Sequence, residues 1–116
     1  MLTSLQNPLV KQIRKLHSSK ERHSQDLLLL EGTHLLEEAY AVDYPLMTLC
    51  CTEKWQTTHF ELWEKASQKC VRAEVVSEEV LSALATTVQP DGVVTTAKRN
   101  YQVKKIPFSG LVLALE

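Results

Sequence analysis

Basic side chains near the amino terminus are the residues of this chain best suited to bind a charged ligand. Five of them occupy the first 25 positions: Lys11, Arg14, Lys15, Lys20 and Arg22. Because this segment holds one acidic residue, its charge is +4, which leaves −5 for residues 26–116 of a chain with a net charge of −1. Basic residues concentrated on one segment of an acidic protein favour binding to a polyanion. A solvated helix face would carry the same charges, and composition does not separate the two interpretations.

A second candidate site begins where a short apolar run, residues 27–30, ends. Glu31 and Gly32 follow that run, and Thr33 and His34 open the next amphipathic stretch. Backbone N–H groups at the start of a helix can meet an anionic or polar ligand. Gly32 is equally explained by a turn that needs unusual backbone angles, and Glu31 by capping or by pairing with a nearby base.

Polar residues near two further turns form a third set of candidates. Thr86, Thr87 and Gln89 supply hydroxyl and amide groups, which turn chemistry explains equally well. Lys98 and Arg99 follow the last apolar strand of this region and would either extend the basic surface or remain solvated.

The cysteines and histidines have no spacing typical of a disulfide framework or a metal site. Cys50, Cys51 and Cys70 are odd in number and two are adjacent, which suits neither a disulfide framework nor a zinc site, so we expect reduced, buried thiols. The four histidines share no metal-chelating spacing, and we predict no metal site. With no leader and no apolar run of membrane length, we expect a cytoplasmic protein and no membrane partner.

Aromatic residues between positions 55 and 63 could be mistaken for a platform on which bases stack. Phe60 and Trp63 have a spacing that suits a helix face packed against a sheet, so we expect both in the core. Trp55 precedes that helix and is left open.

A helix is predicted to begin near the amino terminus, since Asn7 can cap it and Pro8 suits its first position. Leu9, Ile13 and Leu16 would form its apolar face, which leaves the basic residues toward solvent or ligand.

Strands and helices are predicted to alternate through the rest of the chain. Apolar or β-branched runs predict strands at 27–30, 46–51, 71–76 and 93–97. Helical patterns lie between them, at 33–40, at 60–66 and after the capping residue Ser77. Because parallel neighbours need helical crossovers, this order predicts an α/β fold with a mainly parallel sheet sandwiched by helices.

Four segments are expected in the domain organisation. Residues 1–25 would form a basic helical extension and residues 26–97 the α/β domain. Residues 98–110 have the composition of an interdomain linker, and residues 111–116 form an apolar run that would be the first strand of a further, missing domain.

Ordered segments across nearly the whole chain resemble the substrate-binding domain of SpoU-type (TrmH-like) RNA ribose methyltransferases. They are TSLQNPLVK at 3–11, RKL at 14–16, LLEGTHLLEEA at 29–39, VSEEVL at 76–81 and TTVQPDGVV at 86–94. The resemblance implies an amino-terminal RNA-binding domain, similar in fold to the kink-turn-binding ribosomal proteins, followed by a catalytic domain.

The enzyme implied by the resemblance is a homodimer that binds S-adenosylmethionine and methylates a ribose 2′-hydroxyl of rRNA or tRNA. Its catalytic and cofactor-binding residues would lie beyond Glu116, so we assign none here, and we expect the fragment alone to be inactive and to bind no cofactor.

RNA contacts are expected on the three candidate surfaces described above. They comprise Asn7, Lys11, Arg14, Lys15, Arg22, Glu31, Thr33, His34, Gln89 and Lys98. Two other functions remain open: a freestanding RNA-binding protein of the ribosomal type, and a protein-interaction domain whose basic helix docks an acidic partner.

Overall fold

A four-stranded sheet lies at the centre of the computed structural model, which describes residues 1–87 and 90–99. Its strands are β1 (Leu27–Glu31), β2 (Leu46–Cys51), β3 (Arg72–Val75) and β4 (Val93–Lys98), in the spatial order β1-β4-β2-β3. The helices of the described residues are α1 (Pro8–Lys15), α2 (Ser19–Gln25), α3 (Thr33–Ala41), α4 (Glu53–Thr58), α5 (Phe60–Lys69) and α6 (Glu78–Leu84).

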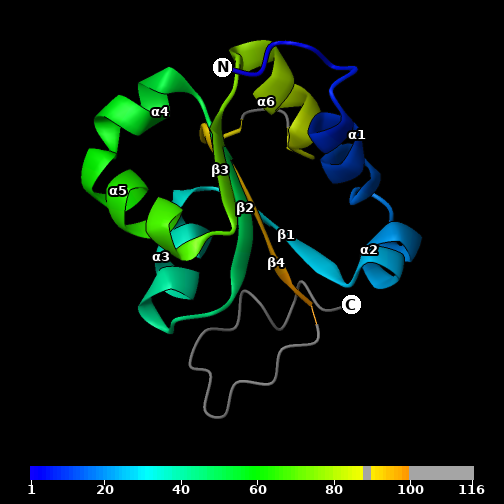
Figure 1. Cartoon of the computed structure of the whole chain (residues 1–116), viewed down its shortest axis with the longest axis horizontal. Coiled ribbons are helices and arrows are strands. Elements are labelled where there is room, and N and C mark those ends of the chain that lie inside the picture. Colours follow the sequence, from blue (N-terminus) through cyan, green and yellow to red (C-terminus); the bar gives the residue numbers. More distant parts are fainter. Residues whose placement is uncertain (88–89, 100–116) are drawn as a thin grey trace.

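Helices cover both faces of this sheet, as the sequence predicted. Figure 1 shows the sheet nearly edge-on, with α3, α4 and α5 on one side and α1, α2 and α6 on the other. Two apolar clusters follow from that arrangement. One joins the sheet to α3, α4 and α5 and includes Leu36 and Trp55, and the other joins it to α1 and α6 and includes Ile13 and Leu84.

The direction of β4 refines the expected mainly parallel sheet. β2 and β3 pair in parallel, but β4 lies between β1 and β2 and runs antiparallel to both. Val93, the first residue of β4, pairs with Cys51, the last residue of β2, and Val94 pairs with Glu31, the last residue of β1. The chain therefore re-enters the sheet at the edge where β2 ends, and the α/β fold is confirmed with a mixed sheet.

Local signals place α1 where the sequence predicted it. The Asn7 side chain accepts a hydrogen bond from the Leu9 N–H at 2.9 Å, with Pro8 as the first helical residue. Leu9 and Ile13 are buried against the second cluster, so the first 25 residues contribute to the same core as the rest. Leu2 adds to this by pairing with the residue that follows β3, Val76.

The structure decides the position of Trp55, which the sequence left open, and corrects that of Phe60. Trp55 is buried, with 3% of its surface exposed, whereas Phe60 is 52% exposed, so its prediction as a core residue was wrong. Leu62 and Ala66 of α5 face the core, and Phe60, two residues before Leu62, lies about 200° around the helix from it. Trp63 packs partly buried against the core, as predicted.

The cysteines are free, and Cys50 and Cys51 are buried, which confirms the prediction for these two. Burial raises the pKa of both thiols to about 12 and that of the half-buried Cys70 to about 11. Such thiols are poor nucleophiles because the thiolate is the reactive form.

The part of the chain that the structure describes has neither a membrane-spanning helix nor a cluster of metal-binding side chains. None of its helices has the length and apolar character needed to cross a bilayer. It also brings together no group of three or more potential metal-binding side chains. Gln89 and the predicted final strand at 111–116 lie outside the described residues, as does all but the start of the predicted linker.

Candidate nucleic-acid interface

Three cations stand together on the exposed side of α1. Lys11, Arg14 and Lys15 are exposed, and together with His17 they line an open groove of about 340 Å³. They share this side because the apolar residues of α1 are buried on the other. We call Lys11, Arg14 and Lys15 the basic face of α1.

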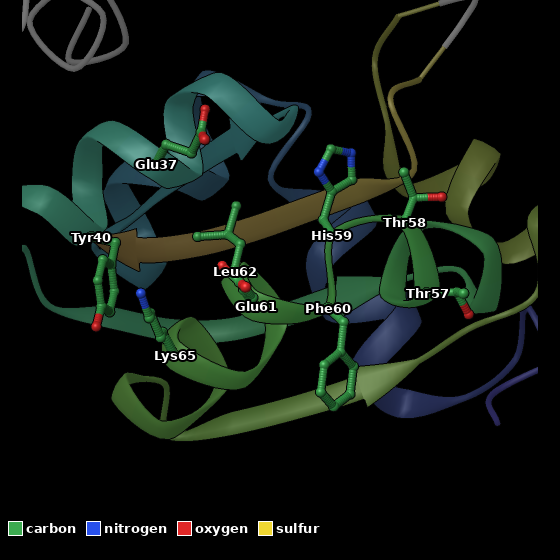
Figure 2. Close-up of a pocket in the computed structure, with 9 residues that line it drawn as sticks. All are labelled: Glu37, Tyr40, Thr57, Thr58, His59, Phe60, Glu61, Leu62 and Lys65. Atoms are coloured by element: carbon green, nitrogen blue, oxygen red, sulfur yellow. The ribbon is translucent and has the colours of Figure 1, made fainter.

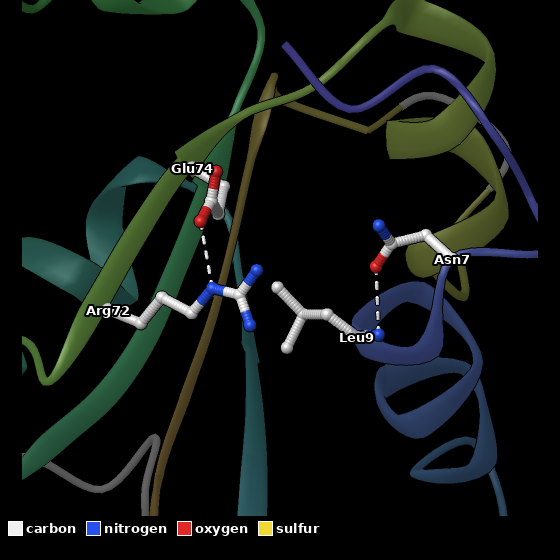
Figure 3. A network of polar contacts seen from close by, with 4 residues as sticks. All are labelled: Asn7, Leu9, Arg72 and Glu74. Carbon is white, nitrogen blue, oxygen red and sulfur yellow. Dashed lines mark hydrogen bonds and ion pairs between the residues drawn. The ribbon is translucent and has the colours of Figure 1, made fainter.

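Carboxylates do not neutralise these cations within the residues that the structure describes. Ion pairs there join Lys69 to Asp43 at 2.9 Å and Arg72 to Glu74 at 2.8 Å, but none involves the basic face. Figure 3 shows the second of these pairs on β3, in the same view as the hydrogen bond that caps α1. Arg14 and Lys15 gain some stability from the helix dipole, since they lie in the last turn, but they remain available to an anionic ligand.

The carboxyl end of α1 is tied to its surroundings by two side chains. Arg22 is half-buried and its Nη1 donates to the Leu16 carbonyl at 2.8 Å. His17 Nε2 lies 2.7 Å from the Leu84 carbonyl at the end of α6. Arg22, a predicted RNA contact, thus has a structural role within the chain, and Asn7 has one as the α1 cap.

Glu31 holds the turn that follows α6 against the end of β1. Its carboxylate accepts from the backbone N–H groups of Thr86 at 2.9 Å and Thr87 at 3.3 Å, and also from the Thr86 hydroxyl. Charged hydrogen bonds of this kind are stronger than neutral ones. Glu31, a predicted RNA contact, is therefore bonded to Thr86, a candidate of the third set.

Asp91, which was not among the residues predicted from the sequence, connects the turn before β4 to the start of α3. It accepts hydrogen bonds from both the hydroxyl and the backbone N–H of Thr33, the latter at 2.8 Å, and these lower the pKa of its carboxyl. Trp55 Nε1 in turn donates to the Thr33 hydroxyl at 2.8 Å. The sequence signalled a turn at Asp91 and gave no sign of a partner.

Two glycines allow these segments to approach. Gly32 has a φ of +101°, which confirms the unusual backbone angle predicted for it. Gly92 has a φ of +94°, and a Cβ there would lie 3.0 Å from the Trp55 Cβ.

His34, a predicted RNA contact, is exposed over 83% of its side chain, and its Nε2 lies 3.4 Å from the Glu38 carboxylate.

Acidic residues dominate this edge of the sheet, where β1, β2 and β3 end. Besides Glu31 and Asp91, Glu53 opens α4, while Glu78 and Glu79 open α6. A phosphate is repelled by such a surface. The predicted contacts at 31–34 thus lie in surroundings that oppose a polyanion, in contrast to the basic face of α1.

Lys98 lies at the far end of β4 from this edge, since it pairs with Leu27 while Val94 pairs with Glu31. Lys98 itself is exposed. Arg99 is buried, with 8% of its surface exposed; its N–H donates to the Asp26 carbonyl at 2.9 Å and its guanidinium contacts the His23 ring. Of the third set of candidates, the structure therefore places Thr86 at the end of β1, beside Glu31, and Lys98 at the opposite end of the sheet.

A further groove, of about 580 Å³, lies between α3 and the α4–α5 junction, across the sheet from α1. Figure 2 shows its lining, in which Glu37 and Glu61 outnumber Lys65. Its charge also disfavours a polyanion.

Comparisons with known proteins identify the family. Residues 7–95 match the model of the MRM3-like substrate binding domain, and the chain belongs to this family. An uncharacterized tRNA/rRNA methyltransferase of Synechocystis sp. is 50% identical over 95 residues, which are 82% of this chain and 35% of that protein.

Solved structures agree with this assignment. An rRNA methyltransferase from Sinorhizobium meliloti is similar with a TM-score of 0.73 and 27% identity over 87% of this chain and 37% of that one. An RNA 2′-O ribose methyltransferase is similar with a TM-score of 0.70 and 25% identity over 90% of this chain and 39% of that one. This chain thus spans little more than a third of the length of these relatives.

Proposed function

We propose that this chain is the RNA-binding part of an S-adenosylmethionine-dependent RNA 2′-O-ribose methyltransferase, and that the basic face of α1 is its main RNA contact. The observation that carries the location is the group of three exposed cations without a carboxylate partner among the described residues. Family membership and the methyltransferase relatives support the activity of the whole enzyme. These relatives do not favour a freestanding ribosomal-type protein.

The cofactor would be held outside the described residues. Open α/β sheets take nucleotide ligands where their strands end, and at that edge the polar groups of Glu31, Asp91, Thr33 and Trp55 are already engaged in hydrogen bonds within the chain. The described residues therefore do not fit S-adenosylmethionine at this place, although an AdoMet-bound rRNA methyltransferase from Sinorhizobium meliloti is among the similar structures. We accordingly infer that residues 1–116 alone transfer no methyl group.

The rest of the proposal concerns the whole enzyme. It would act on rRNA or tRNA in the cytoplasm, as a homodimer formed through its catalytic domain. Residues 98–110 would link the two domains and residues 111–116 would begin the second.

A charge-reversal experiment tests the RNA contact. The variant Lys11→Glu/Lys15→Glu should weaken binding to an rRNA fragment by about tenfold or more at low salt, because it removes two phosphate contacts and adds repulsion. Fluorescence anisotropy of a labelled fragment measures the Kd.

The matched control is Lys54→Glu/Lys65→Glu, which changes the net charge equally with two exposed lysines on α4 and α5, across the sheet. It should change the Kd by less than about twofold. Equal losses in both variants would mean that only total charge matters, and no loss in the α1 variant would refute the proposed contact and favour docking of a protein partner.

A further inference from the structure

We propose that the basic face of α1 binds the sugar–phosphate backbone of a base-paired RNA stem rather than unpaired nucleotides. The proposal rests on the proposed function and adds the class of RNA structure that this surface takes.

The tyrosine, tryptophan and phenylalanine side chains that the structure describes lie away from the basic face. Proteins that bind unpaired nucleotides stack the bases on aromatic rings beside a cationic groove. Among the described residues, Tyr44 and Trp55 are buried, and Trp63 packs against the core on α5. Tyr40 and Phe60 line the groove between α3 and α5, on the other side of the sheet.

The groove of the basic face therefore offers charge with little stacking surface. Its lining consists of Lys11, Arg14, Lys15 and His17. The ring of His17 is engaged through Nε2 with the Leu84 carbonyl at 2.7 Å, which holds one edge of the ring against α6. Contacts from lysine and arginine to phosphates position a protein on a nucleic acid without reading base identity.

A packed helix fixes the backbone positions from which these cations extend. α1 is capped by Asn7, and its apolar face is buried from Leu9 to Leu16. Lys11 and Lys15 are separated by about 6 Å along the helix axis, at 1.5 Å per residue. Charges preset in this way suit the regular phosphates of an RNA helix, which proteins recognise mainly by shape and backbone contacts.

The neighbouring charges set the direction in which such a stem would lie. The Leu2 carbonyl accepts from Ser77 N–H at the start of α6, and His17 meets Leu84 at its end, so α1 and α6 run the same way. The acidic start of α6 is thus at the far end from Arg14 and Lys15, and Lys20 follows on α2. The favourable path for phosphates runs from the end of α1 toward α2.

Two RNA probes of the same sequence test the proposal with the 116-residue chain. One is a labelled single strand of about 16 nucleotides, and the other is that strand annealed to its complement. A duplex of about 16 base pairs is the length that one double-stranded RNA-binding domain spans. Anisotropy titrations at stepped KCl concentrations give the Kd and its salt dependence. The duplex should bind at least about fivefold more tightly than the single strand at low salt.

The variant Lys11→Gln/Arg14→Gln/Lys15→Gln shows whether the basic face is responsible. It should reduce the slope of log Kd against log salt for the duplex by about 3, one for each cation lost, while Lys54→Gln/Lys65→Gln should leave the slope nearly unchanged. Single-strand binding that equals or exceeds duplex binding and depends on the three α1 residues would overturn the duplex proposal alone. A slope that the α1 variant leaves unchanged for both probes would overturn the proposed function and this inference together.

Discussion

Gly92 and Gly32 both have positive φ angles, but their surroundings differ, and this difference can be measured. A Cβ at Gly92 would press on the Trp55 side chain at 3.0 Å, whereas one at Gly32 would have its nearest neighbour, Asp91, at 3.9 Å. Gly32→Ala should therefore cost only the backbone strain, about 1–3 kcal/mol. Gly92→Ala should cost at least about 1 kcal/mol more, because Trp55 must shift.

Urea denaturation of the two variants gives both free energies of unfolding, and each glycine serves as the control for the other. Equal losses would show that the contact with Trp55 relaxes without cost.

The Asp91 carboxylate should make stability depend on pH in the acid range. Its pKa is lowered by the hydrogen bonds from Thr33 in the folded chain, so its contribution is present above the ordinary carboxyl pKa and is lost as the pH falls through the lower, folded value. The gap in unfolding free energy between wild type and Asp91→Asn should therefore be widest near neutral pH and narrow progressively below about pH 4.

Chemical denaturation from pH 3 to pH 7 measures this gap. Glu61→Gln, an exposed change on α5, is the control and should leave a small, flat difference. A gap for Asp91→Asn that stays constant over the whole range would contradict the assigned role.

The partners of Asp91 explain why residue-level predictions reached only part of the site. The sequence indicated Lys11, Arg14 and Lys15 because they are basic residues within five positions of one another, close enough to share one side of a helix. Thr33 lies 58 residues from Asp91, and no local pattern in the chain links two such positions. The same limit applies to Glu31, whose bonds to Thr86 span 55 residues.

Asn7 determines where α1 begins and should be tested as a cap. Asn7→Ala should lower the free energy of unfolding by about 1 kcal/mol, because the N–H of Leu9 loses its acceptor, whereas Asn7→Asp should keep the cap. Thermal or urea denaturation measures both.

The same pair of variants tests the prediction that Asn7 lies near RNA. Asn7→Asp keeps the fold and adds a negative charge, so it should weaken RNA binding if Asn7 is close to phosphates. Unchanged affinity in a fully stable Asn7→Asp protein would restrict Asn7 to capping.

Individual elements were predicted well wherever local chemistry determines them. Asn7 and Ser77 cap their helices as expected, with Ser77 Oγ accepting from the Val80 N–H at 3.1 Å. The direction of β4 could not be predicted, because the apolar pattern of 93–97 is the same for a strand of either direction. The exposure of Phe60 depends on which side of α5 packs against the sheet. The spacing between Phe60 and Trp63 does not determine that side.

Charge is segregated over the part of the molecule that the structure describes, as the division of charge in the sequence indicated. The +4 segment forms α1 and α2 on one side of the sheet, while carboxylates collect at the edge where β1, β2 and β3 end. Such a field orients an approaching polyanion and speeds its association at low salt. The division at residue 98 between domain and linker remains a prediction.

The position of β4 has a consequence for the order in which the chain folds. β1 and β2 reach each other only through β4, which is the last strand of the sheet to leave the ribosome. Until residue 98 has emerged, β1 has no neighbouring strand, so its backbone hydrogen-bonding groups have no β4 partner. Contacts so distant in sequence form slowly. We therefore expect β1 to join the sheet only after β4 is available, whereas the β2–β3 pair can form earlier.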